Sequence, residues 1–172
     1  MIAAEMEVGE SDHRSRVGEL YARFAPTGLR LAYLLTGDSA IAEDLVQEAF
    51  IRFVGRLHHL GNPDAFDAYL RRTIVNLSKN HFRRSSVERS YLERQARQSP
   101  PSREEPDVLG YQMMREALLG LPVRQRAAIV LRYYEDRSEA EIADILRCRP
   151  ATVRSLVSRG LQALRKTPEV TR

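Results

Sequence analysis

Ser138 to Lys166, SEAEIADILRCRPATVRSLVSRGLQALRK, is the stretch that decides how this chain folds. Ser138 followed three residues later by Glu141 is a capping box, which predicts that a short helix begins at Ser138. Pro150 suits the first turn of a second helix, because its missing N–H would be unpaired there in any case. The stretch therefore predicts two helices joined by a tight turn, a helix-turn-helix.

The second helix, beginning near Arg149 or Pro150, has an apolar face and a polar face. The inward stripe is Val153, Leu156, Val157, Leu161 and Leu164, and the residues facing away or at the margin are Arg149, Thr152, Arg154, Ser155, Ser158, Arg159 and Gln162. From Arg147 to Lys166 the chain carries six basic residues and no acidic one. Because arginine pairs with guanine in the major groove, this face predicts DNA binding. The alternative is an ordinary pair of packed helices.

The turn between the two helices holds Arg147 where a glycine is common. A positive φ there would cost a residue with a Cβ on the order of 1 kcal/mol, so either the turn relaxes or the strain is tolerated. The single cysteine, Cys148, cannot form an internal disulfide. We interpret it as a small buried hydrophobe, with a redox-sensing role as the alternative.

Length and composition restrict which class of protein this chain can be. With 172 residues and 43% hydrophobic content, the chain can build one medium domain or two small ones. No apolar run approaches the length of a membrane span and no secretory signal is present, so we expect a cytoplasmic protein without membrane insertion. The four histidines, His13, His58, His59 and His81, form no metal-ligand spacing with Cys148. No catalytic or nucleotide-binding motif occurs, so we expect no catalytic residue, metal or cofactor.

Charge is distributed unevenly along the chain. Met1 to Phe50 carries nine acidic residues against four arginines, whereas Arg71 to Arg97 carries eight basic residues against two acidic ones. Arg124 to Lys166 is a second basic block, with ten basic and five acidic residues. Two basic blocks and an acidic front part predict two contacts with nucleic acid and a different partner for the first part. Solvated helix faces are the alternative.

Two compact segments are separated by a stretch that is too polar to build a core. Residues 85–107, SSVERSYLERQARQSPPSREEPD, are charged and broken by three prolines, and we interpret them as a tether with some helix continuing to about Gln95. Such a tether would let the domains at 16–84 and 108–167 take independent positions. Gly37 followed by Asp38, and a further start at Asp64, predict helices throughout the first domain. The predicted fold is all-α, with two small helical domains joined by a flexible linker.

The helix predicted from Asp64 to Arg84 divides by face. Phe66, Leu70, Thr73, Ile74 and Leu77 fall on one side, and Arg72, Asn76, Lys79 and Arg83 fall on the other. The second set can follow a phosphate backbone and offer hydrogen bonds to exposed bases. Phe66, Tyr69 and Phe82, with His58 and His59, could stack on unpaired bases. Core packing is favoured for Phe66 and Phe82, and the two alternatives are about equal for Tyr69.

Three stretches resemble the extracytoplasmic-function (ECF) sigma factors of bacterial RNA polymerase. AYLLTGDSAIAEDLVQEAFIRF, residues 32–53, looks like the region that docks on the polymerase clamp helices. AYLRRTIVNLSKNHFRR, residues 68–84, is similar to the helix that opens and reads the −10 promoter element. LPVRQRAAIVLRYYED, residues 121–136, together with the helix-turn-helix, resembles the domain that reads the −35 element and contacts the polymerase flap.

The resemblance implies a role for each matching position. Core polymerase would be contacted by Asp44, Gln47, Glu48 and Ile51, which share one helical face. The −10 element would be contacted by Asn62, Tyr69, Arg72, Asn76, Lys79, Asn80 and Arg83, with Asn62 in a loop that captures a flipped base. The −35 element would be read by Arg149, Thr152, Arg154, Ser155, Ser158 and Arg159. Implied partners are core RNA polymerase, promoter DNA and, as in many members, an anti-sigma factor.

Two other readings compete with a sigma factor. A repressor or activator, dimeric on a palindromic operator, would explain the helix-turn-helix. It leaves unexplained the acidic face of DLVQEAF, residues 44–50, and the basic face of the helix predicted from Asp64 to Arg84. A nucleic-acid enzyme such as a recombinase would need a nucleophile constellation that this sequence does not offer.

Overall fold

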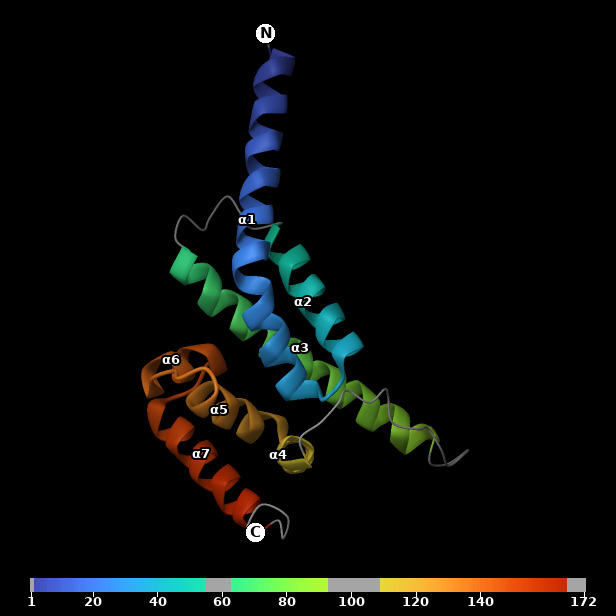
Figure 1. Ribbon diagram of the computed structural model, residues 1–172, viewed down its shortest axis with the longest axis vertical. Helices are drawn as coiled ribbons and strands as arrows, with labels where there is room; N and C mark the ends of the chain where they lie inside the picture. Colours follow the sequence, from blue (N-terminus) through green and yellow to red (C-terminus); the bar gives the residue numbers. More distant parts are fainter. Residues whose placement is uncertain (1, 55–62, 93–108, 167–172) are drawn as a thin grey trace.

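The computed structural model describes residues 2–54, 63–92 and 109–166 (Figure 1). These residues form seven helices and no strand, which confirms the predicted all-α class. In chain order the helices are α1 (Ile2–Thr36), α2 (Ser39–Val54), α3 (Pro63–Leu92), α4 (Leu109–Leu119), α5 (Val123–Tyr133), α6 (Glu139–Leu146) and α7 (Pro150–Arg165).

Helices α1, α2 and α3 pack around one apolar centre. Leu31, Leu35, Val46, Leu70 and Ile74 are each fully buried there. Four phenylalanines extend this core: Phe53 lies 4.3 Å from the ring of Phe66, and Phe24 and Phe50 lie 5.0 and 5.3 Å from it. Phe66 is 1% exposed, so its predicted place in the core is confirmed.

The predicted break at Gly37 and Asp38 separates α1 from α2. Gly37 has φ of 74°, a left-handed conformation that glycine adopts without a Cβ penalty. The Asp38 carboxylate accepts a hydrogen bond from the Ile41 N–H at 3.0 Å, which caps the first turn of α2. This reversal places α2 alongside the C-terminal half of α1.

The C-terminal helices α4 to α7 form the second unit, in which α5 is packed by α6 and α7. Ala127, Ala128, Val130, Leu131 and Ile142 are buried at its centre. Gly160 lets α7 approach α5 closely, since a Cβ at Gly160 would stand 2.5 Å from the Cδ1 of Ile129.

The two units pack against each other. Helix α3 contacts α5 and α6, and α1 contacts α4 and α5 (Figure 1). Buried side chains of both units join in one hydrophobic cluster. This differs from the independent positions that the composition of residues 85–107 predicted. Helix α3 also continues to Leu92, well into that segment and in line with the helical extension toward Gln95.

None of the described helices combines the length and the apolar character that a membrane crossing requires.

Candidate nucleic-acid interface

The predicted capping box begins the helix-turn-helix. The Ser138 hydroxyl accepts a hydrogen bond from the Glu141 N–H at 3.3 Å, and the Glu141 carboxylate accepts one from the Ser138 N–H at 2.8 Å. Hydrogen bonds from the Ser138 hydroxyl and N–H, together with one from Arg137, lower the pKa of the Glu141 carboxyl to about 2. The cap therefore stays ionised, and α6 begins as predicted.

The turn adopts the strained conformation. Arg147 has φ of 48° and ψ of 59°, the left-handed region that glycine usually fills, and its side chain is exposed. The Cys148 N–H donates to the Ala143 carbonyl at 3.0 Å, which closes the end of α6. Cys148 is only half-buried, although it packs against the core as predicted.

Helix α7 presents the predicted basic face to solvent. Arg149 is the N-cap residue and Pro150 the first helical residue, in agreement with the predicted start. Of the six residues proposed for DNA reading, five are exposed: Arg149, Thr152, Arg154, Ser158 and Arg159. Ser155 is half-buried, and its hydroxyl donates to the Ala151 carbonyl at 3.0 Å. Arg154 forms an ion pair with Glu139 of α6 but keeps 66% of its side chain exposed.

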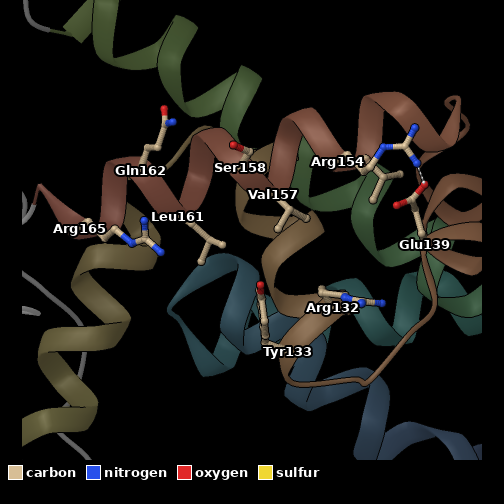
Figure 2. A pocket seen from close by; sticks show the side chains of 10 residues that line it. Arg132, Tyr133, Glu139, Arg154, Val157, Ser158, Leu161, Gln162 and Arg165 are labelled. Carbon is tan, nitrogen blue, oxygen red and sulfur yellow. Dashed lines mark hydrogen bonds and ion pairs between the residues drawn. The ribbon is translucent and has the colours of Figure 1, made fainter.

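A groove runs between α7 and the C-terminal end of α5. Figure 2 shows Tyr133 and Arg132 on one side of it and the α7 side chains Val157, Ser158 and Leu161 on the other. Tyr133 is 58% exposed at this edge. Tyr133 therefore places an exposed aromatic ring beside α7, the helix predicted to read bases.

The outer face of α3 carries most of the second predicted contact. Asn76, Lys79, Asn80 and Arg83 are all exposed. Tyr69 is half-buried, with its ring 5.8 Å from that of Phe53, so it packs on the core edge. Asn62, His58 and His59 lie outside the described residues.

Phe82 and Arg72 are partly engaged within the chain. Phe82 is half-buried, and the guanidinium of Arg126 lies 4.9 Å from its ring centre. Arg72 donates to the Asp144 carbonyl at 3.0 Å and to the Asp144 carboxylate at 3.3 Å, so its side chain is only 25% exposed. Sequence reasoning placed Arg72 on the free face of its helix, but Asp144 of α6 occupies it in this structure.

An ion-pair network that the sequence did not reveal lies beside Arg72. Arg71 of α3 is 5% exposed, pairs with Asp67 one turn earlier, and donates from Nε to the Glu135 carboxylate at 2.8 Å. Arg137 donates to Asp67 at 2.6 Å and to Glu141 at 2.9 Å. Burial lowers the pKa of the Arg71 guanidinium, and the attraction of Glu135 opposes that effect. Within this network only the i, i+4 spacings, Asp67 with Arg71 and Arg137 with Glu141, can be read from the sequence.

Two further arginines tie the second unit to the end of α1. Arg126 is 3% exposed and donates to the Leu35 carbonyl of α1, and also to the carbonyls of Leu119 and Leu121 at 2.8 and 3.0 Å. Desolvation lowers the pKa of this guanidinium to about 10. Arg115 donates to the Gly37 carbonyl. Both arginines satisfy carbonyls that the end of α1 leaves unpaired.

The acidic face of α2 is open. Asp44 and Gln47 are exposed, and Ile51 leaves 67% of its side chain in solvent. Glu48 accepts a hydrogen bond from Arg52 at 2.7 Å and stays 45% exposed. All four residues of the predicted polymerase contact are therefore accessible on α2.

The fold and these surfaces define a helical DNA-binding protein with a helix-turn-helix. Residues 20–87 match the family Sigma-70 region 2, and residues 111–164 match the family Sigma-70, region 4. The RNA polymerase sigma-E factor of Streptomyces coelicolor is 33% identical over 138 residues, which cover 80% of this chain and 77% of that protein. The ECF RNA polymerase sigma factor SigE of Mycolicibacterium smegmatis is 34% identical over 153 residues, which cover 86% of this chain and 59% of that protein.

A solved structure has the same fold. It is the sigma factor RpoE in complex with the anti-sigma factor NepR from Bartonella quintana, with a TM-score of 0.72 and 24% identity over 90% of this chain and 98% of that one. With both sigma-70 family matches and the relatives at 33% and 34% identity, the chain belongs to the ECF RNA polymerase sigma factors.

Proposed function

We propose that this chain binds core RNA polymerase and directs promoter-specific transcription initiation. The module at 108–167 would read the −35 element with α7, and the module at 16–84 would open and read the −10 element with α3. The chain would act through binding alone, with no catalytic residue and no cofactor of its own.

The exposed basic face of α7 is the observation that carries the proposal. Arg149, Arg154 and Arg159 stand on the first turns and middle of the second helix of a helix-turn-helix, the part that enters the major groove in this motif. Arginines in that position pair with guanine or bind phosphate. The exposed stripe of Asn76, Lys79, Asn80 and Arg83 on α3 adds a second surface with the same chemistry.

We assign the polymerase contact to the α2 face made of Asp44, Gln47, Glu48 and Ile51. The carboxylates of Asp44 and Glu48 make this surface negatively charged, and the exposed side chain of Ile51 offers an apolar contact. The solved relative is described in complex with an anti-sigma factor, and we propose a protein of that class as a further partner of this chain.

Charge reversal on α2 tests the proposal directly. Asp44→Lys with Glu48→Lys is expected to abolish association with core polymerase and run-off transcription, because two repulsive contacts replace two attractive ones. Glu19→Lys, a single charge reversal on an exposed part of α1, is the control and should retain both activities. Unchanged transcription by the α2 variant would refute the assignment.

A dimeric operator-binding repressor is the competing function, and salt dependence separates the two. A sigma factor alone should bind promoter DNA weakly and with steep salt dependence, and gain sequence-specific binding only with core polymerase. Tight, specific operator binding by the isolated chain would favour the repressor.

A further inference from the structure

The turn between α6 and α7 holds an arginine in a backbone conformation that favours glycine. Arg147 has φ of 48° and ψ of 59°, whereas the end of α1 has Gly37 in the same left-handed region. A Cβ in this region approaches the next carbonyl oxygen too closely, which costs stability. Asp136, the other described residue with a Cβ and a positive φ, has a short polar side chain of the kind that tolerates it. Arg147 has no such compensation.

The side chain of Arg147 does not contribute to the turn. It is exposed, and its guanidinium has no hydrogen bond or ion pair with any residue that the structure describes. The end of α6 is closed by the backbone N–H groups of Arg147 and Cys148, which donate to the carbonyls of Asp144 and Ala143. Glycine would supply the same N–H without the strain. A strained residue whose side chain has no internal contact points to a contact outside the chain.

Arg147 lies beside the end of α7 that is proposed to enter the major groove. Together with Arg149, the N-cap residue of α7, it lines an open hollow that Arg72 borders from α3. Asp144 lines the same hollow, but it is paired with Arg72. Within the described part of the chain, Arg147 and Arg149 have no carboxylate partner. Their positive charge is therefore available to an external anion.

The dimensions of the major groove bring a phosphate close to this turn. An α-helix with its side chains is about 10–12 Å across, and the groove is about 12 Å wide. A recognition helix therefore fills the groove, and residues just before its first turn lie at the sugar-phosphate strand that borders it. A guanidinium at that place can donate two parallel hydrogen bonds to one phosphate.

We propose that Arg147 binds a backbone phosphate of the −35 element when α7 lies in the major groove. The inference rests on the proposed function, because that function places α7 at this element. A phosphate contact carries no sequence information, so Arg147 adds affinity and fixes the position of α7 without selecting bases. The strain in the turn is tolerated because it keeps a positive charge at this point.

Substitutions of Arg147 separate the strain from the charge. Arg147→Gly removes both, Arg147→Gln removes only the charge, and Arg147→Lys keeps both. In urea unfolding followed by far-UV circular dichroism, Arg147→Gly should shift the midpoint to higher urea, and the other two variants should match the wild type. Lys166→Gly is the control and should not raise the midpoint, because Lys166 is an exposed cap residue with φ of −83°. A midpoint of Arg147→Gly at or below that of the wild type would overturn the claim that the side chain is kept despite strain.

The salt dependence of DNA binding tests the phosphate contact. The full-length chain is titrated onto a mixed-sequence duplex and followed by fluorescence anisotropy. The wild type should bind more tightly than Arg147→Gln, and this ratio of affinities should shrink about three- to fourfold between about 50 and 200 mM salt, because the variant releases one counterion fewer. Arg147→Gly should behave like Arg147→Gln, and Arg147→Lys like the wild type.

Lys166→Gln is the matched control for the loss of charge. Lys166 is exposed at the opposite end of α7, about 24 Å along the helix from Arg149, so its variant should keep the wild-type dependence on salt. A salt dependence of Arg147→Gln equal to that of the wild type would overturn the phosphate contact.

Promoter complexes with core polymerase distinguish a phosphate contact from a base contact. Arg147→Gln should weaken the complexes by the same factor on a promoter and on derivatives with substituted −35 bases. A loss confined to the unsubstituted −35 element would overturn the assignment to phosphate. Absence of run-off transcription by the wild-type chain with core polymerase would instead refute the proposed function, while the duplex titration would still show whether Arg147 contacts phosphate.

Discussion

Gly160 sets how closely the DNA-reading helix packs on α5, and its replacement has a calculable outcome. A methyl group at Gly160 would stand 2.5 Å from the Cδ1 and 3.3 Å from the Cγ1 of Ile129. Ile129 is 3% exposed and packs among the buried side chains of the second unit, so moving its Cδ1 requires those neighbours to repack. Gly160→Ala therefore forces α7 away from α5 or strains the Ile129 rotamer.

Two opposing free energies determine the size of the effect. Alanine in a helix interior stabilises by about 1 kcal/mol relative to glycine, and overpacking a close contact costs about 1–3 kcal/mol. The expected result for Gly160→Ala is a net loss of about 1 kcal/mol in the free energy of unfolding. Ile129→Val removes the Cδ1 atom and by itself should cost about 1 kcal/mol.

The double variant separates the gain in helix propensity from the cost of overpacking. With Cδ1 gone, the nearest Ile129 atom is the one now at 3.3 Å, which needs to give only a few tenths of an ångström. Gly160→Ala should then stabilise the Ile129→Val background, and the double variant should unfold near the wild type. The coupling free energy between the two sites is expected to be about 2 kcal/mol.

Urea unfolding followed by far-UV circular dichroism measures this cycle, since the chain has no tryptophan to report by fluorescence. Gly18→Ala on exposed α1 is the matched control, because no heavy atom lies within 4 Å of the methyl position. That variant should gain about 1 kcal/mol and show no coupling to Ile129. Additive effects of Gly160→Ala and Ile129→Val, or stabilisation by Gly160→Ala equal to that of Gly18→Ala, would refute the reasoning.

Three further outcomes follow from the helix-turn-helix. Ser138→Ala removes the cap of α6 and should lower the free energy of unfolding by about 1 kcal/mol; an unchanged urea midpoint would contradict this. The Glu141 carboxyl has a pKa of about 2 in the folded chain against an ordinary 4.5. The stability that the ionised carboxylate contributes is therefore complete above pH 4.5 and is lost as the pH falls toward 2. The difference in the free energy of unfolding between wild type and Glu141→Gln should therefore shrink as the pH falls over that range. A difference that grows as the pH falls would contradict this prediction. Arg154→Ala should weaken promoter binding by the polymerase complex by about 1–3 kcal/mol if Arg154 contacts a base. Glu139→Gln removes only its exposed ion pair and should change binding by less than about 1 kcal/mol in gel-shift titrations.

Local rules made the helix-turn-helix predictable. The capping box and the proline at the start of α7 each depend on residues within a few positions of one another, and both occur in the structure. The left-handed conformation of Arg147 is one of the two alternatives that the sequence left open. The faces of α2, α3 and α7 followed from helical periodicity in the same way. The resemblance to ECF sigma factors, carried by motifs on these same helices, is confirmed by the family matches and the similar ECF sigma factors.

The contact between the units could not be read from the sequence. Arg71 and Glu135 are 64 residues apart, and Arg72 and Asp144 are 72 apart. A periodic pattern places a side chain on a face but does not say which distant element covers that face. The polar, proline-containing stretch at 85–107 even suggested independent domains, because composition describes a segment's own inability to form a core and not the packing of the domains that it joins.

Ion pairs and apolar side chains share the interface between the two units. A buried ion pair such as Arg71–Glu135 loses hydration on both charges, so it adds little net stability compared with apolar side chains of the same size. The free energy that holds the units together therefore comes mainly from the apolar side chains that both units contribute to one buried cluster.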